Sequence, residues 1–228
     1  DHASGRLSVA YQRFGGWYDG NNDALILDNT QTGLQHSDRL DVMGTGTIEI
    51  DDNRQLQLVT QYYKSQGDDD YGLNLGKGFS AIRGTSTPFV SNGLNSDRIP
   101  GTERHLISLQ YSDSAFLGQE LVGQVYYRDE SLRFYPFPTV NANKQVTAFS
   151  SSQQDTDQYG MKLTLNSKPM DGWQITWGLD ADHERFTSNQ MFFDLAQASA
   201  SGGLNNKKIY TTGRYPSYDI TNLAAFLQ

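Results

Sequence analysis

Residues 38–64 read DRLDVMGTGTIEI (38–50), DDNR (51–54) and QLQLVTQYYK (55–64), and this stretch decides the fold. Successive side chains of an extended strand point to opposite sides, so apolar residues at every second position mark one face. Each arm has about ten residues or more, which is long for a soluble strand and suits a tilted strand that crosses a bilayer. The stretch therefore predicts a hairpin in the wall of a transmembrane β-barrel. The face toward lipid is expected to carry Leu40, Val42, Ile48, Ile50, Leu56 and Leu58, and the lumen face Thr45, Thr47 and Gln57.

The composition excludes several function classes. With 26 Asp and Glu against 18 Lys and Arg, the 228 residues have a formal net charge of −8, and no nucleic-acid partner is expected for so acidic a chain. It contains no Cys, which excludes disulfides, thiolate metal ligands and a Cys nucleophile. No run of about 18 apolar residues predicts a transmembrane helix. The mean hydropathy of −0.61 is that of a soluble protein, but barrels share it because polar lumen residues alternate with lipid-facing ones.

The alternation recurs and predicts further strands near 3–15, 105–113, 121–128, 159–166, 173–184 and 219–228. Long loops are expected near 16–37, 65–103, 129–155 and 186–218, and short turns near 51–54, 113–119 and 168–172. Outer-membrane barrels have this arrangement, with long extracellular loops and short periplasmic turns. The alternative is a soluble β-sandwich or β-helix with inserted loops. Charged residues at alternate positions, such as Lys162 and Asp180, disfavour it because a dry core between two sheets would not accept them.

Four segments resemble the barrel of TonB-dependent outer-membrane siderophore receptors, and the resemblance extends over essentially the whole chain. They read GRLSVAY (5–11), QYYKSQGDDDYGLNLG (61–76), YYRDESLRFYPFP (126–138) and DITNLAAFLQ (219–228). The resemblance implies a barrel of about 22 strands closed by an N-terminal plug domain. It also implies a bacterial outer-membrane receptor that imports a ferric siderophore with energy passed through TonB. The alternation starts and stops within strands, so we expect residues 1–228 to be the N-terminal part of such a barrel. That part would hold about eight strands and neither the plug nor the TonB-contacting region.

The long loops are the expected ligand-binding regions. A ferric citrate-hydroxamate siderophore is anionic, and Arg side chains with aromatic faces suit such a ligand. The alternative for each residue is a surface charge or a loop-packing aromatic. The candidates are Tyr71, Lys77, Phe79, Arg83 and Arg98 in the loop 65–103, Arg133, Tyr135 and Phe137 in the loop 129–155, and Arg214 and Tyr215 in the loop 186–218. Arg83, Arg133 and Tyr135 are the first choices for mutation.

Metal and catalytic patterns are weak. Asp68, Asp69 and Asp70 are interpreted as a solvated loop and not as a calcium site, and the four His residues are scattered. No Ser-His or Asp-His pairing indicates an enzyme, so none is expected, nor any cofactor, because iron would arrive already chelated. The expected partners are the ferric siderophore, outer-membrane lipid, TonB and, at the long loops, bacteriocins or phage. Three alternatives remain. Two are outer-membrane barrels, one an enzyme and the other a receptor for another ligand. The third is a soluble carbohydrate-binding β domain that would use Trp17, Trp173 and Trp177.

Overall fold

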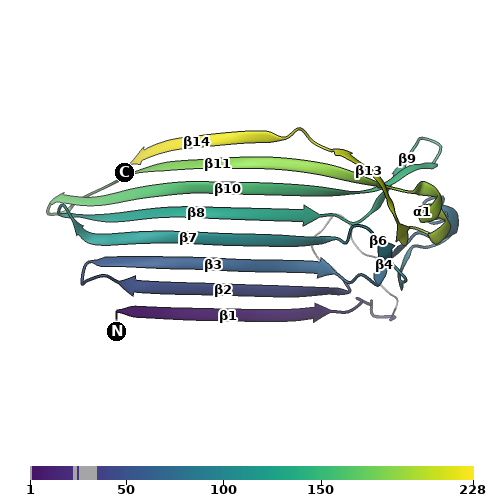
Figure 1. Cartoon of the computed structure of the whole chain (residues 1–228), viewed down its shortest axis with the longest axis horizontal. Helices are drawn as coiled ribbons and strands as arrows, with labels where there is room; N and C mark the ends of the chain where they lie inside the picture. Colours follow the sequence, from purple (N-terminus) through teal and green to yellow (C-terminus); the bar gives the residue numbers. More distant parts are fainter. Residues whose placement is uncertain (1, 23–24, 26–34) are drawn as a thin grey trace.

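One large antiparallel sheet dominates the computed structural model, which describes residues 2–22, 25 and 35–228 (Figure 1). Part of the predicted loop 16–37, namely 23–24 and 26–34, lies outside the described residues. The sheet does not close on itself among the described residues, and the all-β antiparallel prediction is confirmed. Its path is β1 (Ala3–Phe14), β2 (Ser37–Glu49), β3 (Arg54–Gly67), β7 (Gly101–Phe116), β8 (Gln119–Arg133), β10 (Val146–Met170), β11 (Trp173–Phe193) and β13 (Lys208–Gly213). Two further strands pair with this path, β9 (Phe137–Val140) with β10 and β14 (Tyr218–Leu227) with β11.

The register gathers the apolar side chains on one face of the sheet. Leu58 of β3 pairs with Leu109 of β7, and Leu109 pairs with Val125 of β8. The row continues through Met161 of β10 to Ala181 of β11. Leu109 is 39% exposed and Val125 53% exposed, although both are apolar and lie in the middle of long strands. Among the described residues these apolar positions are left partly uncovered, which is what a lipid-covered wall requires.

The opposite face is polar, and its side chains bond across neighbouring strands. The Gln61 side-chain amide donates to Asp41 Oδ1 at 3.0 Å. Lys162 Nζ lies 3.4 Å from Asp180 Oδ2. Because side chains alternate, residues adjacent in sequence supply both faces, and the middle of the wall is amphipathic.

Tight turns join the strands at one end of the sheet. In the β2–β3 turn, Asp51 Oδ1 accepts from the backbone N–H groups of Asn53 and Arg54, and Oδ2 accepts from Arg54 Nε at 2.7 Å. These bonds, led by the Arg54 side chain, hold the pKa of Asp51 below its usual range. The β7–β8 connection is shorter than the predicted 113–119 turn, since only Leu117 and Gly118 lie between the strands, with φ of 51° and 80°. This pair of left-handed residues fits the right-handed twist of a two-residue hairpin.

At the other end, the strands run further than the sequence predicts. β8 continues to Arg133, β10 begins at Val146, and β11 continues to Phe193, so each extends well into an expected loop. The prediction fails there because the period-two pattern is lost. Phe149, Ser150 and Ser151 are consecutive and all buried, which means that both faces of β10 are covered at this point. Alternation marks a strand only where one face alone is apolar.

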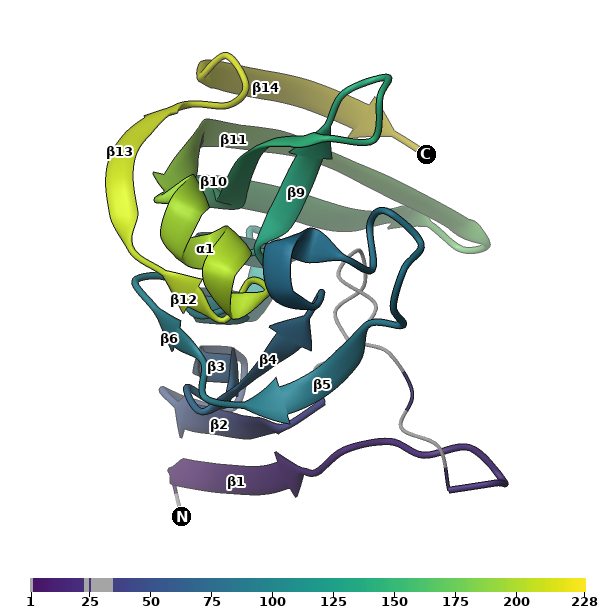
Figure 2. The same ribbon diagram turned by 90° about the vertical axis from the view of Figure 1, so that its right-hand side faces the viewer.

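The predicted loops contain regular elements that fold over this end of the sheet. We call the connections 68–100, 134–145 and 194–217 the cap, and Figure 2 shows them gathered in front of the receding strands. A small apolar core of Leu75, Phe79, Phe149, Phe193 and Ala198 holds them together. The additional elements of the cap are β4 (Tyr71–Asn74), η1 (Lys77–Phe79), β5 (Phe89–Asn92), β6 (Asn95–Ser96), α1 (Leu195–Ser201) and β12 (Asn205–Asn206).

None of the helices in the described part of the chain combines the length and the apolar character needed to cross a membrane.

The cap core generates a prediction about local stability. Phe149 is 2% exposed and contacts both Phe79 and Phe193, with ring centroids 5.3 Å and 6.2 Å away. Phe149→Ala is expected to cost about 3–5 kcal/mol of local packing, because it removes an aromatic ring from a filled core. Limited proteolysis of the cap connections should then become much faster. Phe89→Ala, at a cap side chain that is 49% exposed, is the matched control and should leave the rate near that of the unmodified protein. Equal rates for both variants would contradict a packed cap.

Candidate functional site

Backbone bonds between distant segments make the cap one unit. The Leu75 N–H donates to Gly202 O at 2.7 Å, and the Asn95 N–H donates to Leu204 O at 2.8 Å. β6 and β12 form a short parallel pair. The first and last cap connections therefore meet directly, although the strands β7 to β11 separate them in sequence.

Asp97 and Arg98 anchor the first connection to the strand ends. Arg98 is only 7% exposed, donating from Nη1 to Ser151 O at 3.0 Å and from Nη2 to Asn189 Oδ1 at 2.6 Å. Burial lowers the pKa of Arg98 from its ordinary value. Asp97 accepts from the Lys208 N–H at 2.7 Å and from Lys207 Nζ at 3.3 Å, and the Lys208 bond in particular lowers the pKa of Asp97. The guanidinium of the predicted candidate Arg98 is therefore occupied by hydrogen bonds that stabilise the fold.

Two aromatic candidates also have structural roles. Phe79 is 2% exposed and belongs to the cap core. Tyr135 is buried against Leu73 and Val90, and burial raises the pKa of its hydroxyl to about 12. Their rings contribute apolar area to the interior of the cap and offer little surface to a ligand.

Three candidates from two different connections come together. The Arg214 guanidinium carbon lies 5.2 Å from the ring centroid of Phe137 and 5.2 Å from that of Tyr215. Arg214 Nη1 is buried and has no hydrogen-bond partner among the described residues. The Tyr215 N–H donates to Ser188 Oγ at 2.8 Å, which fixes the backbone beside the cluster. Arg214 Nη1 is therefore closed to a ligand, and the remainder of this half-buried cation, beside two aromatic rings, is suited to bind an anion.

Arg133 is half-buried and weakly paired. Its Nη2 lies 4.0 Å from Glu103 Oε2, and among the described residues neither Nε nor Nη2 has a hydrogen-bond partner. No ion pair or cation–π contact between described residues joins Arg133, at the end of β8, to the Arg214 cluster.

Tyr71 has a ring partner that the sequence analysis missed. Its ring stacks on His36 with centroids 4.0 Å apart and planes 6° from parallel, and the Asp68 N–H donates to His36 O at 2.6 Å. No local pattern links these residues, because they lie on different connections. The stack holds the exposed Tyr71 ring in a defined orientation.

Arg83 lies in a cleft of about 510 Å³ between η1, the β9–β10 turn and α1. Phe79, Val146 and Leu195 supply apolar lining, and exposed Lys144 adds a second cation. Lys144 was missed because it lies in the turn between the short strand β9 and the long strand β10, within a predicted loop. Its φ of 58°, where Gly or Asn is favoured, is the unusual feature at this position. Lys77 of η1 is exposed and does not line the cleft.

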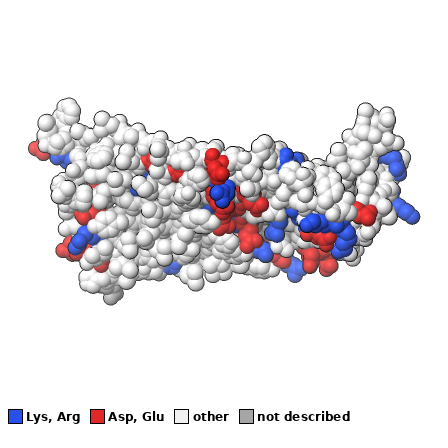
Figure 3. Space-filling view, turned by 45° about the horizontal axis from the view of Figure 1, so that its top comes forward, with Lys and Arg blue, Asp and Glu red and all other residues white. Residues whose placement is uncertain are grey.

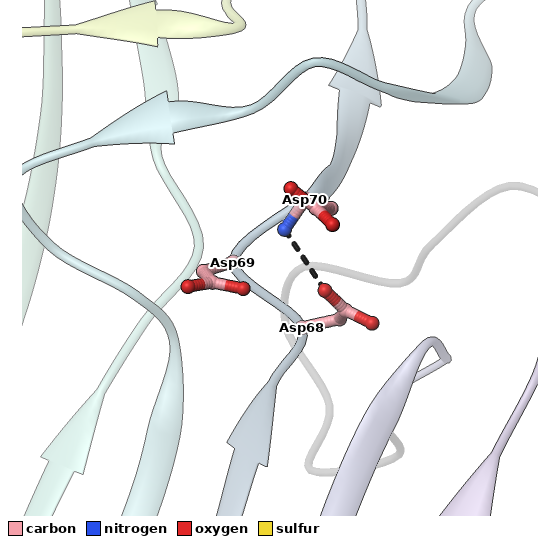
Figure 4. Close-up of side chains that lie close together, drawn as sticks. All are labelled: Asp68, Asp69 and Asp70. Carbon is pink, nitrogen blue, oxygen red and sulfur yellow. Dashed lines mark hydrogen bonds between the residues drawn. The ribbon is translucent and has the colours of Figure 1, made fainter.

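The acidic triplet of residues 68–70 lies at the start of the first cap connection. Ligand atoms of Asp68, Asp69 and Asp70 are within 4.8 Å of one another. Figure 4 shows the Asp70 N–H directed at Asp68 Oδ1, at 2.9 Å. Asp68 Oδ2 also lies 3.6 Å from Arg13 Nη2. These contacts shape a turn and partly neutralise Asp68, in keeping with a solvated loop.

Charged side chains are unevenly distributed over the surface. Figure 3 shows large areas without charge and patches in which acidic and basic side chains lie side by side. On the apolar face, the positions between the apolar rows and the cap carry such pairs. Examples are His105 with Asp129 at 2.9 Å and Arg185 with Asp219 at 2.9 Å. Among the described residues, 8 of the 18 Lys and Arg side chains form ion pairs, and Arg83, Lys144 and Arg214 of the cap are not among them.

Comparison with known proteins gives matches over the whole chain. No family model matches it. It is 94% identical over 228 residues to a ferric aerobactin receptor of Klebsiella pneumoniae and 93% identical over 228 residues to that of Escherichia coli, in each case covering 100% of this chain and 31% of the relative. It is 40% identical over 223 residues to a rhizobactin receptor of Rhizobium meliloti (strain 1021), covering 98% of this chain and 30% of the relative. The chain thus spans about a third of the length of these curated relatives. Over its full length the chain is the counterpart of a segment of siderophore receptors, as its resemblance predicts.

Proposed function

We propose that the chain forms part of the wall and extracellular cap of a TonB-dependent outer-membrane receptor that imports ferric aerobactin, a citrate-hydroxamate siderophore. The identities of 94% and 93% to ferric aerobactin receptors support this assignment. The single structural observation that carries it is the combination of an amphipathic open sheet with a preassembled cap at one end only. A wall of this kind needs lipid on one side and an aqueous lumen on the other.

The cap is the proposed ligand-binding region. Of the ten candidates, those with surface left for a ligand are Tyr71, Lys77, Arg83, Arg133, Phe137, Arg214 and Tyr215. Iron enters as cargo that the siderophore already chelates, so the protein needs no metal ligand and no cofactor. The proposed activity is capture and transport, with no covalent step and hence no enzyme chemistry.

The remaining partners follow from the same proposal. Outer-membrane lipid would cover the apolar face, and TonB would act through a region of the receptor N-terminal to this chain. The cap, as the outward-facing surface, is where bacteriocins or phage would dock. The carbohydrate-binding alternative loses support because Trp177 lies on the apolar face, where it pairs in register with Leu165 and Leu227.

Adjacent residues on opposite faces provide a test of lipid contact. Leu109→Arg places a charge on the apolar face and is expected to cost about 2–4 kcal/mol near the bilayer midplane. Gln110→Arg, one residue along β7, places the same charge on the polar face and should be tolerated. The amount of full-length receptor assembled in outer membranes and its thermal unfolding midpoint in lipid vesicles measure the difference. Equal tolerance of both changes would count against lipid on this face.

Ligand class is tested with the full-length receptor purified in detergent. Saturable binding is expected for a ferric citrate-hydroxamate siderophore and not for a ferric catecholate, because the relatives of 94% and 93% identity are ferric aerobactin receptors. Fluorescence quenching or isothermal titration measures both ligands on the same preparation. Failure of the citrate-hydroxamate ligand to bind would refute the proposed function.

Arg214 gives a residue-level test of the same function. Arg214→Gln removes an aromatic-stacked cation and should weaken ferric siderophore binding by roughly tenfold, the scale of one hydrogen bond to a charged group. Arg54→Gln removes the same charge at the opposite end of the sheet and serves as the control. An unchanged dissociation constant for Arg214→Gln would exclude this side chain from the site.

A further inference from the structure

The cleft between η1, the β9–β10 turn and α1 has the chemistry of a binding site for an amphiphilic anion. It has about 510 Å³ of space, which is within the range of small-molecule sites. Phe79, Val146 and Leu195 form apolar lining from three separate segments, and Arg83 and Lys144 add positive charge. Apolar lining with a few charged groups is the usual composition of such sites.

Both cations of the cleft are unneutralised. Among the described residues neither Arg83 nor Lys144 forms an ion pair. The chain has a formal net charge of −8, and 8 of its 18 Lys and Arg side chains, such as Lys162 and Lys207, have acidic partners. Arg83 and Lys144 belong to the remainder, and the cleft brings the two of them together. An anionic ligand approaching an acidic protein is repelled unless a local positive potential is available.

The backbone around the cleft has two unusual features, one at Lys144 and one at Gly78. Lys144 has a φ of 58°, in a turn where Asn141 Oδ1 accepts from the N–H groups of Asn143 and Gln145 at 3.0 Å. A non-glycine residue in this region is less stable than Gly would be. The guanidinium of Arg83 lies over Gly78, where an added Cβ would be 3.3 Å from Nη2. Gly78 thus leaves room for the guanidinium beside the backbone of η1.

We propose that this cleft binds the carboxylate groups of the ferric siderophore between Arg83 and Lys144, with less polar parts of the chelate over Val146 and Leu195. The proposal rests on the proposed function and adds a specific subsite to it, one that includes Lys144. The unpaired positive charge serves chiefly to speed association, because charges at the edge of a site act on the encounter rate more than on the final contacts.

The test measures association rates of a ferric citrate-hydroxamate siderophore with the full-length receptor at low and high salt. Arg83→Gln and Lys144→Gly should each slow association about threefold at low salt, and the double variant about tenfold, with a weaker salt dependence. Gly accepts the backbone conformation at 144, so Lys144→Gly should fold at least as well as the original. Lys144→Arg keeps the charge and should keep the rate.

A matched control and the thermal unfolding midpoint of each variant separate the outcomes. Lys168→Gln removes one positive charge at the opposite end of the sheet and should leave the rate unchanged. A double variant that folds normally and associates at the original rate would overturn the cleft assignment while leaving the proposed function intact. An unmodified receptor that does not bind the siderophore at all would overturn the proposed function itself.

Discussion

The continuous antiparallel register from β1 to β14 is the constraint on which the rest of the structure depends. Because side chains alternate, a shift of one residue between any two strands would move the apolar set to the polar face. The row that joins Leu58, Leu109 and Val125 exists only in this register. The polar pairs on the opposite face, such as Gln61 with Asp41, depend on it equally. The pairing of the strands thus places apolar side chains on one face of the sheet and polar side chains on the other.

The wall could be predicted from the sequence and the cap could not, for the same physical reason. Period-two alternation is visible where one face is apolar and the other polar, as in residues 38–64. It disappears at Phe149, Ser150 and Ser151, where both faces are covered. The cap core joins Leu75 of the first connection to Phe149 of β10 and Phe193 of β11, and no local pattern links residues so far apart.

The candidate site was predicted by residue type, and the structure divides those candidates by what surrounds them. Arg98 and Tyr135 have the expected chemistry but are buried, because a cap this size needs its own interior. Arg214 and Phe137 do lie together, although they were chosen as candidates only for their charge and their aromatic ring. Lys144 escaped notice because its significance lies in a left-handed backbone conformation and a neighbouring cleft, neither of which a residue type reveals.

The contact between Asp97 and Lys207 joins residues 110 positions apart and has a consequence for folding order. Closing so long a loop is entropically costly unless the intervening chain is already compact. The strands β7 to β11 provide that compaction, since their pairing brings the two cap connections to the same end of the sheet. We infer that the cap is completed late, after the wall has paired. The parallel β6–β12 pair can then form only if the wall is in its correct register, since a misregistered sheet would hold these two short strands too far apart to pair.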